Sequence, residues 1–193
     1  HATPAAPCSH TRVRFWNQHN EELRFVDLRS FGEMWWIPEG DDLDSVMTGL
    51  KRLGPEPFSD AFTGAYLKQR LKGSARPIKT ALLDQSLIAG VGNIYADESL
   101  FAAGIPPLSP SGKLTIEQLI RLRDELVNVL HISIGVGGTT FSDFRDLEGV
   151  NGNYGGQSWV YRRSGQPCRK CGTPISREKL SGRSTHWCPS CQR

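Results

Sequence analysis

Four cysteines near the end of the chain restrict its fold more than any other feature. They form two Cys-x2-Cys pairs with sixteen residues between them: Cys168, Cys171, Cys188 and Cys191. Zn²⁺ prefers four thiolates in closed structural sites, and two such pairs at one end of a hairpin supply them. Two disulfides in an exported protein, or an iron site with the same ligands, are the alternatives. Since no signal-peptide pattern opens the chain, the spacing favours one structural zinc ion and leaves Cys8 as a free thiol.

The segment that holds these cysteines is also basic. Residues 159–193 carry eight Lys or Arg and one Glu, a net charge of +7, whereas the other 158 residues carry 15 basic and 19 acidic side chains. A segment of this length hardly buries a core of its own, so we expect the metal to hold it together. A basic module on a mildly acidic body indicates a polyanionic partner. A second run of basic residues comprises Lys68, Arg70, Lys72, Arg76 and Lys79. It contains no acidic residue, although such a run is more often a solvated face.

The overall composition is typical of a folded protein. Of the 193 residues, 38% are hydrophobic and 22% are charged, and the net charge is +3. A chain of this length can bury one sizeable core, or one core and a small satellite. No apolar run reaches the roughly 20 residues that a membrane span needs, so we expect no membrane partner.

Strand signals come first along the chain and helix signals follow. Residues 12–17 and 22–28 are rich in β-branched and aromatic side chains and predict a hairpin, with a third strand expected at 30–37. Apolar spacing and capping residues predict helices within 40–54, 55–73 (capped by Ser59 or Asp60), 78–90, 93–104 and 114–138 (capped by Thr115). Residues 141–157 are rich in Gly, Asn and Asp and predict a long loop. These elements indicate the α+β class.

The segment GVGNIYADE, residues 90–98, places two glycines directly before a predicted helix. Glycine costs a helix about 1 kcal/mol relative to alanine, so Gly90 and Gly92 need a reason. One reading is an anion site, because glycines let a phosphate approach the backbone and the free N–H groups of a helix start favour negative charge. Asn93 would then add an amide donor. In the other reading the glycines merely allow close helix packing and Asn93 is only a cap.

Three stretches together resemble the formamidopyrimidine-DNA glycosylase family. They are GVGNIYADESLFAAGI from residue 90, GTTFSDF from residue 138, and VYRRSGQPCRKCGTPI from residue 160 with GRSTHWCPSCQ from residue 182. The likeness begins near His10 and continues to the end. It implies a two-domain clamp around DNA: an N-terminal β-sandwich of which 1–53 is the remainder, a helix-two-turn-helix domain at 54–158, and a zinc finger at 159–193.

The resemblance also implies a reaction. Members of the family flip an oxidised purine, such as 8-oxoguanine or a formamidopyrimidine, out of the stack, cleave its glycosidic bond, and nick the strand by β,δ-elimination. The implied partner is damaged double-stranded DNA, bound by a monomer in the bacterial cytoplasm at the nucleoid.

Residue by residue, the resemblance assigns phosphate binding to Lys79, Asn93 and Arg183. It adds for Arg183 a role as proton donor late in the elimination, and an arginine on a stiff hairpin turn suits bidentate capture of a phosphate. Arg29 and Phe31 match the pair that fills the space left by the flipped base, where an apolar wedge partly offsets the lost stacking. Taken alone, Phe31 is more often a core residue.

The resemblance extends DNA binding to four further positions: His10, Arg76, Gly92 and Tyr161. For His10 an ordinary surface histidine is the alternative. Ser30 stands where the family carries a second arginine, which removes one expected phosphate contact. Residues 141–157 match the segment that closes over the extruded base.

The catalytic groups that the family implies are missing from these 193 residues. They are an N-terminal proline whose amine attacks the sugar, a glutamate directly after it, and a later lysine. The sequence starts at His1, and Pro4 and Pro7 are internal amides without a nucleophilic lone pair. We therefore expect a chain cut from a longer one, or else a processed or tagged terminus. We also expect that this polypeptide does not form the covalent Schiff-base intermediate.

Two other functions compete with a bifunctional glycosylase and lyase. The first is a non-catalytic, zinc-dependent module that binds damaged DNA. The second is a zinc-ribbon interaction protein with no DNA role, which the combination of Lys79, Asn93 and Arg183 disfavours.

Overall fold

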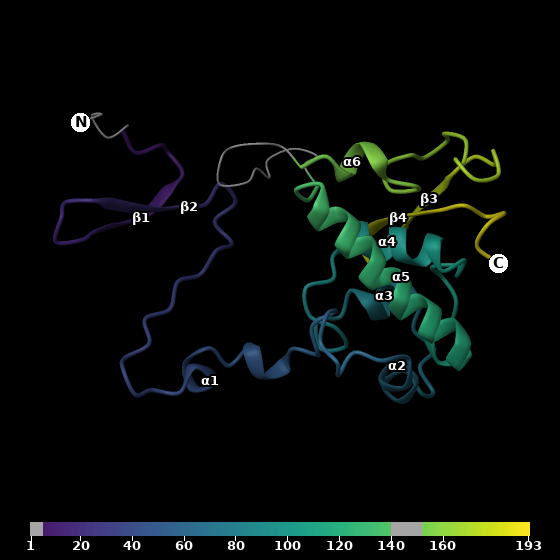
Figure 1. Ribbon diagram of the computed structural model, residues 1–193, viewed down its shortest axis with the longest axis horizontal. Helices are drawn as coiled ribbons and strands as arrows, with labels where there is room; N and C mark the ends of the chain where they lie inside the picture. Colours follow the sequence, from purple (N-terminus) through teal and green to yellow (C-terminus); the bar gives the residue numbers. More distant parts are fainter. Residues whose placement is uncertain (1–5, 140–151) are drawn as a thin grey trace. The chain divides into compact units, whose positions relative to one another are not determined.

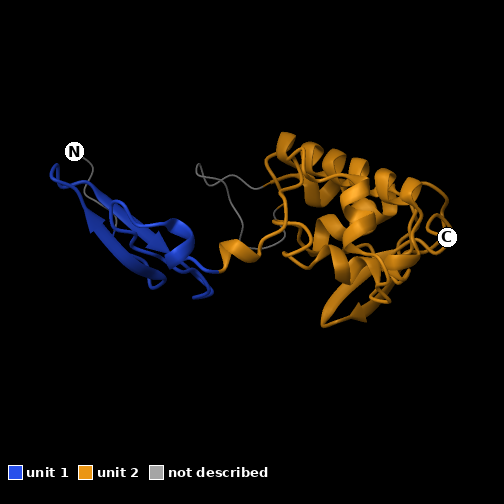
Figure 2. Cartoon of the chain, turned by 90° about the horizontal axis from the view of Figure 1, so that it is seen from below, with its two compact units in different colours: residues 1–48 blue, residues 49–193 orange. Residues whose placement is uncertain are grey.

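The computed structural model describes residues 6–139 and 152–193. The chain divides into two compact units, residues 1–48 and 49–193, drawn in different colours in Figure 2. The expected domain boundaries after residues 53 and 158 stay predictions. Of the part of the chain that is described, no helix is both long and apolar enough to cross a bilayer.

The first unit contains the expected hairpin. Strands β1 (Thr11–Trp16) and β2 (Glu22–Val26) pair antiparallel, as Figure 1 shows. Glu22 forms ion pairs with Arg14 and Arg24, and hydrogen bonds from both guanidinium groups lower the pKa of its carboxyl to about 2. None of the described residues of this unit is buried, so the hairpin has no hydrophobic core within it.

The third strand expected at 30–37 is absent, and the prediction is wrong. The carboxylate of Asp27 accepts the backbone N–H groups of Arg29, Ser30 and Gly32, at distances of 2.6–3.0 Å. Ser30 adopts a left-handed φ of 55°. This local turn takes the backbone out of the extended conformation that pairing requires.

The helix expected within 40–54 is broken into two short pieces. Helix α1 (Leu43–Val46) begins at Asp42, whose side chain accepts the Asp44 N–H, and a 3₁₀ turn follows at Leu50–Arg52. Met47 ends α1 with non-helical backbone angles, φ −99° and ψ 66°. The acidic first turn is thus present, but only one turn of helix follows it.

The second unit is a helical body. Its helices are α2 (Gly64–Arg70), α3 (Ile78–Leu82), α4 (Asn93–Ala102), α5 (Ile116–Gly135) and α6 (Tyr154–Gln157). Thr115 caps α5 as expected, in a capping box with Gln118. The cap of α2 is Thr63, which accepts the Tyr66 N–H, and not Ser59 or Asp60. The reason is that turns occupy the chain up to Phe62, whose N–H donates to the Ser59 carbonyl.

The hydrophobic core lies where α5 packs against α2 and α4. Gly64 allows the approach of α2, because a Cβ at this position would lie 2.5 Å from the Ile120 side chain. The largest buried apolar side chains of this core are Phe62, Leu67, Leu71, Ile78, Leu82, Ile88, Leu100, Ile105, Leu119, Leu122 and Leu126.

The chain ends in the predicted hairpin. Strands β3 (Ser176–Leu180) and β4 (Arg183–Trp187) pair antiparallel through a two-residue turn. Ser181 and Gly182 both have positive φ, 48° and 82°, which matches the right-handed twist of a tight hairpin. A second, smaller core beside this hairpin includes two of the cysteines: Phe101, Val160, Cys168, Ile175 and Cys188. The α+β class is therefore confirmed.

Candidate nucleic-acid interface and metal centre

The four cysteine sulfurs converge at one site. All four Sγ atoms lie within 4.8 Å of one another, with Cys168 and Cys191 3.9 Å apart and Cys171 and Cys188 3.5 Å apart. Tetrahedral Zn–S bonds of about 2.3 Å place sulfurs about 3.8 Å apart, whereas a disulfide needs about 2.05 Å. Cys8 is free and exposed. The cluster fits one structural zinc ion, which these four cysteines would hold.

The electrostatics of the cluster also suit a metal. Hydrogen bonds with Thr173 lower the pKa of Cys171 to about 6, so this thiol readily supplies a thiolate. Burial raises the pKa of Cys188, a shift that a bound cation reverses.

The hairpin fastened by this cluster presents Arg183 to solvent. Arg183 is the first residue of β4, directly after the Ser181–Gly182 turn. Its guanidinium makes no hydrogen bond or ion pair with any residue of 6–139 or 152–193. A stiff turn thus holds a cation whose donors are all available to a ligand.

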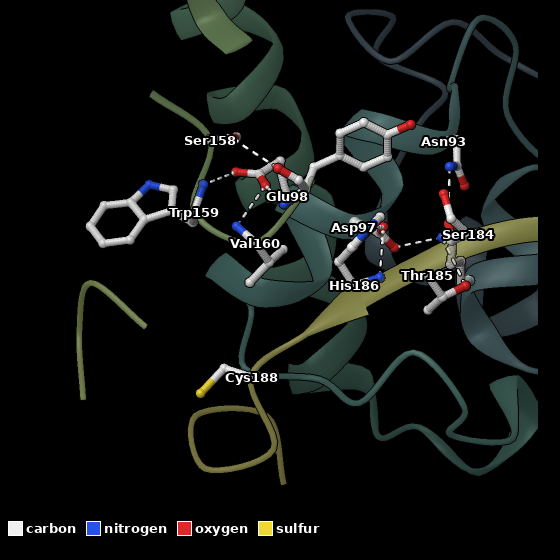
Figure 3. Close-up of polar contacts among 12 residues, drawn as sticks. Asn93, Asp97, Glu98, Ser158, Trp159, Val160, Ser184, Thr185, His186 and Cys188 are labelled. Atoms are coloured by element: carbon white, nitrogen blue, oxygen red, sulfur yellow. Dashed lines mark hydrogen bonds and ion pairs between the residues drawn. The ribbon is translucent and has the colours of Figure 1, made fainter. Parts of the chain in front are cut away.

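The structure brings Asn93 to the same strand. Its Nδ2 donates to the carbonyl of Ser184, the residue after Arg183, at 3.0 Å and across 91 residues of sequence (Figure 3). Its Oδ1 is buried and has no hydrogen-bond partner among the described residues. The Asn93 amide is therefore bound to the residue that directly follows Arg183 in β4.

The glycines before α4 do not serve close packing within the described residues. A Cβ on Gly92 would meet no described atom within 4 Å, and its φ of −104° suits any residue. Gly92 is itself the N-cap of α4, without a side-chain bond, so Asn93 is not the cap. Gly90 has a φ of +78°, which favours glycine whatever its surroundings. Close packing and an Asn93 cap therefore both fail as explanations: Gly90 is explained by its left-handed backbone, and Gly92 leaves the start of α4 open.

Lys79 is buried, unlike a typical phosphate-binding lysine. Its Nζ lies 2.7 Å from Oδ1 of Asp97, and it donates to the Ser184 carbonyl at 2.7 Å and to Oγ1 of Thr185 at 3.0 Å. Burial lowers the pKa of Lys79, and the negative charge of Asp97 opposes that shift. These three contacts, one ion pair and two hydrogen bonds, hold the Lys79 ammonium inside the protein.

Three other members of the basic run at 68–79 also contact protein groups. Arg76 forms an ion pair with Asp84 at 2.8 Å and lowers the pKa of that carboxyl to about 2. Lys68 and Arg70 donate to backbone carbonyls. Lys68, Arg70, Lys72 and Arg76 nevertheless stay exposed, as in a solvated face, and only Lys79 of this run is buried.

Asp97 and Glu98 are central to this region, although no sequence motif predicted a role for them. Oδ2 of Asp97 accepts the His186 N–H at 3.0 Å and lies 3.2 Å from His186 Nδ1. Glu98 accepts the N–H groups of three consecutive residues, 159–161, at 2.8–3.0 Å. Burial raises the pKa of Glu98. The available signal was two adjacent acids in a helix that also carries apolar core residues.

Tyr161 lies half-buried beside the hairpin. Its ring meets the His186 ring edge-on, with 5.0 Å between centroids. Of the loop expected at 141–157, residues 141–151 lie outside the described part. Residues 154–157 form α6, and Thr139 bridges to Asn153.

The first unit exposes the expected wedge pair. Phe31 is 75% exposed, so in this structure it is not a core residue. The Arg29 guanidinium lies over its ring, 4.7 Å from the centroid. His10 is half-buried, with an Nδ1 that has no hydrogen-bond partner among the described residues.

Comparison with known proteins identifies this arrangement. Residues 53–145 match the family model of the formamidopyrimidine-DNA glycosylase H2TH domain, and residues 165–193 match that of the zinc finger found in Fpg and IleRS. A formamidopyrimidine-DNA glycosylase of Parasynechococcus marenigrum is 74% identical over 98% of this chain and 68% of the relative's length. The chain belongs to the formamidopyrimidine-DNA glycosylase family.

Solved structures of this family have the same fold. MutM (Fpg) from Thermus thermophilus aligns with a TM-score of 0.86 at 44% identity, over 97% of this chain and 70% of that one. The Lactococcus lactis Fpg mutant G226P, in complex with DNA containing Fapy-dG, aligns with a TM-score of 0.86 at 32% identity, over the whole of this chain and 70% of that one. The family is thus one of DNA glycosylases that act in base-excision repair, and the predicted resemblance is confirmed.

Proposed function

We propose that this chain binds damaged duplex DNA and supplies the phosphate grip of a glycosylase that removes oxidised purines. The observation that carries the proposal is the meeting of Asn93 with β4. One residue from the Ser184 carbonyl that Asn93 holds, Arg183 presents a guanidinium with no protein partner among the described residues. A cation with available donors, next to a helix start without a side-chain cap, suits a phosphate oxygen.

The role of the first unit follows from its exposed ring. Phe31, backed by Arg29, fills the space left by the flipped base, which partly offsets the lost stacking. His10, Tyr161 and Arg76 complete the proposed contacts with DNA. For Arg76 such a contact competes with its ion pair to Asp84.

For the whole enzyme we propose base removal followed by β,δ-elimination at the abasic site, with Arg183 as a proton donor in the late elimination. The oxidised-purine substrate is supported by the Lactococcus relative, whose structure contains Fapy-dG DNA. We also propose that the protein acts as a monomer in the bacterial cytoplasm, at the nucleoid. The 193-residue polypeptide, which starts at His1, should form no Schiff base with abasic DNA.

Two measurements test these proposals. Borohydride should trap a longer chain with N-terminal Pro-Glu on abasic DNA, and should not trap the 193-residue polypeptide. Trapping of the shorter chain would show that another amine is the nucleophile. Native mass spectrometry of the complex should find one protein chain per duplex.

Binding is tested by fluorescence anisotropy of the zinc-loaded polypeptide with a duplex that contains a tetrahydrofuran abasic-site analogue. Arg183→Ala should weaken binding and reduce the slope of log affinity against log salt by about 0.9, the value for one phosphate contact. The control is Arg193→Ala, which removes the same charge from an exposed side chain that, among the described residues, hydrogen-bonds to Ser190 alone. If the two variants change affinity and salt slope equally, Arg183 contributes only its charge and makes no specific phosphate contact.

A further inference from the structure

Two adjacent carboxylates on α4 face opposite partners in the protein interior. Asp97 and Glu98 are both buried, so neither can touch a DNA phosphate, and their charge would repel one. Ionised side chains are costly to bury unless they are fully paired. Their contacts, drawn in Figure 3, therefore indicate what they are for.

Asp97 holds strand β4. Its Oδ2 accepts the backbone N–H of His186 at 3.0 Å, and its Oδ1 pairs with Nζ of Lys79 at 2.7 Å. Lys79 in turn donates to the Ser184 carbonyl and to Oγ1 of Thr185. Three consecutive residues of β4 are thus fixed to α3 and α4, directly after Arg183.

Fixing three consecutive residues sets the rotation of the strand as well as its position. Side chains alternate between the two faces of a strand, so a slip of one residue would turn Arg183 to the opposite face. Asn93 lies one helical turn before Asp97, on the same face of α4, and it binds the Ser184 carbonyl as well. One face of α4 therefore carries Asn93, which is proposed to bind the phosphate, and Asp97, which orients Arg183, the other proposed phosphate-binding residue.

Glu98 holds a different segment. Its Oε1 accepts the N–H groups of Val160 and Tyr161, at 3.0 and 2.8 Å, and its Oε2 accepts that of Trp159 at 2.8 Å. Three backbone donors on one carboxylate fix the turn from which the Tyr161 side chain leaves the backbone.

We propose that Asp97 and Glu98 are positioning residues, each of which orients a different DNA-binding side chain. Asp97 aims Arg183, and Glu98 aims Tyr161, toward the phosphate that Asn93 binds. This inference rests on the proposed function, since it specifies how the same DNA site is assembled.

Double-mutant cycles separate positioning from simple loss of stability. In anisotropy titrations of the zinc-loaded protein with abasic-analogue DNA, Asp97→Asn should weaken binding by about threefold or more, a coupling that a cycle resolves. The same substitution should have no further effect once Arg183→Ala is present. Glu98→Gln is the matched control, because it neutralises an equally buried carboxylate on the same helix. Its effect should persist beside Arg183→Ala and vanish beside Tyr161→Phe.

The outcomes are distinct. If the effects of Asp97→Asn and Arg183→Ala on affinity are additive, Asp97 does not orient Arg183. If Glu98→Gln couples to Arg183→Ala as strongly as Asp97→Asn does, the two carboxylates do not have separate targets. Either result overturns the proposal. If Arg183→Ala alone leaves affinity and salt slope unchanged, the proposed function has failed instead. Zinc content and circular dichroism show whether each variant is folded. Should Asp97→Asn not fold, Thr185→Val removes one Lys79 contact without changing charge, and it should couple to Arg183 in the same way.

Discussion

Lys79 and Asp97 form a buried ion pair, with Nζ 2.7 Å from Oδ1, that joins α3 to α4 beneath β4. The sequence suggested that Lys79 meets a DNA phosphate. In the structure its ammonium is instead used by Asp97, Ser184 and Thr185. Arg183 and Asn93 are then the groups left with donors for a ligand.

Lys79→Met should therefore act mainly on stability. Removing one partner leaves the Asp97 carboxylate buried without its cation, which costs about 3–5 kcal/mol in comparable pairs. Urea unfolding measures this loss. The double variant Lys79→Met with Asp97→Asn should recover part of it, since the uncompensated charge is gone. If the Lys79→Met protein is instead fully stable and its DNA binding has a reduced salt slope, Lys79 contacts a phosphate after all.

Gly92→Ala should separate folding from binding. The added Cβ meets no described atom within 4 Å, and the backbone angles suit alanine. We expect a change in unfolding free energy within about 1 kcal/mol, because alanine is a poorer N-cap but restricts the unfolded chain. Affinity for abasic-analogue DNA should fall several-fold, since the methyl group occupies the phosphate's approach.

Gly64→Ala is the control for that variant. Its Cβ would lie 2.5 Å from the Ile120 side chain and should lower the thermal midpoint clearly. Unchanged DNA affinity of the Gly92 variant would mean that no phosphate approaches this turn.

Zinc removal should release the hairpin from the helical body. Cys168 and Cys188 belong to the small core beside β3 and β4, so loss of the metal removes the link that joins these two buried side chains to Cys171 and Cys191. A strong chelator should abolish DNA binding and expose Trp187 to solvent, with an increase of its quenching by iodide. Most of the α5 helical signal in circular dichroism should remain, because that helix packs in the separate, larger core. Full binding by metal-free protein would contradict this account.

Local patterns explain which parts of the fold and site were predictable. The cysteine pairs, the tight turn before Arg183 and the Thr115 cap each depend on a few neighbouring residues. The third strand failed because one side chain, Asp27, captures three nearby backbone donors. That signal, an aspartate followed by Ser30 and Gly32, was present in the sequence.

The parts that were not predictable depend on distant partners. Asp97 contacts His186 across 89 residues, and Glu98 contacts the backbone of 159–161 across 61–63 residues. Acids in a helix usually indicate a solvated face. Only the fold shows that these two are buried, and that four members of the basic run before them contact carbonyls or carboxylates.

Glu98 provides a prediction for pH dependence. Burial raises the pKa of its carboxyl above the ordinary 4.5, although three backbone N–H groups oppose the shift. Between 4.5 and the raised value, the folded protein binds more protons than the unfolded chain, so this group makes stability fall as pH rises. Glu98→Gln removes the titration. The unfolding free energy of wild type minus that of Glu98→Gln should therefore decrease as pH rises from 4.5 toward neutrality.

Urea unfolding of both proteins with saturating zinc measures this difference. Titration of the cysteine ligands affects both proteins alike and cancels in the subtraction. An increase of the difference with pH would show that the three N–H bonds outweigh burial, so that the folded state prefers the carboxylate. Glu98 would then stabilise the 159–161 turn as an anion receptor, and removing its charge should weaken that turn most at neutral pH.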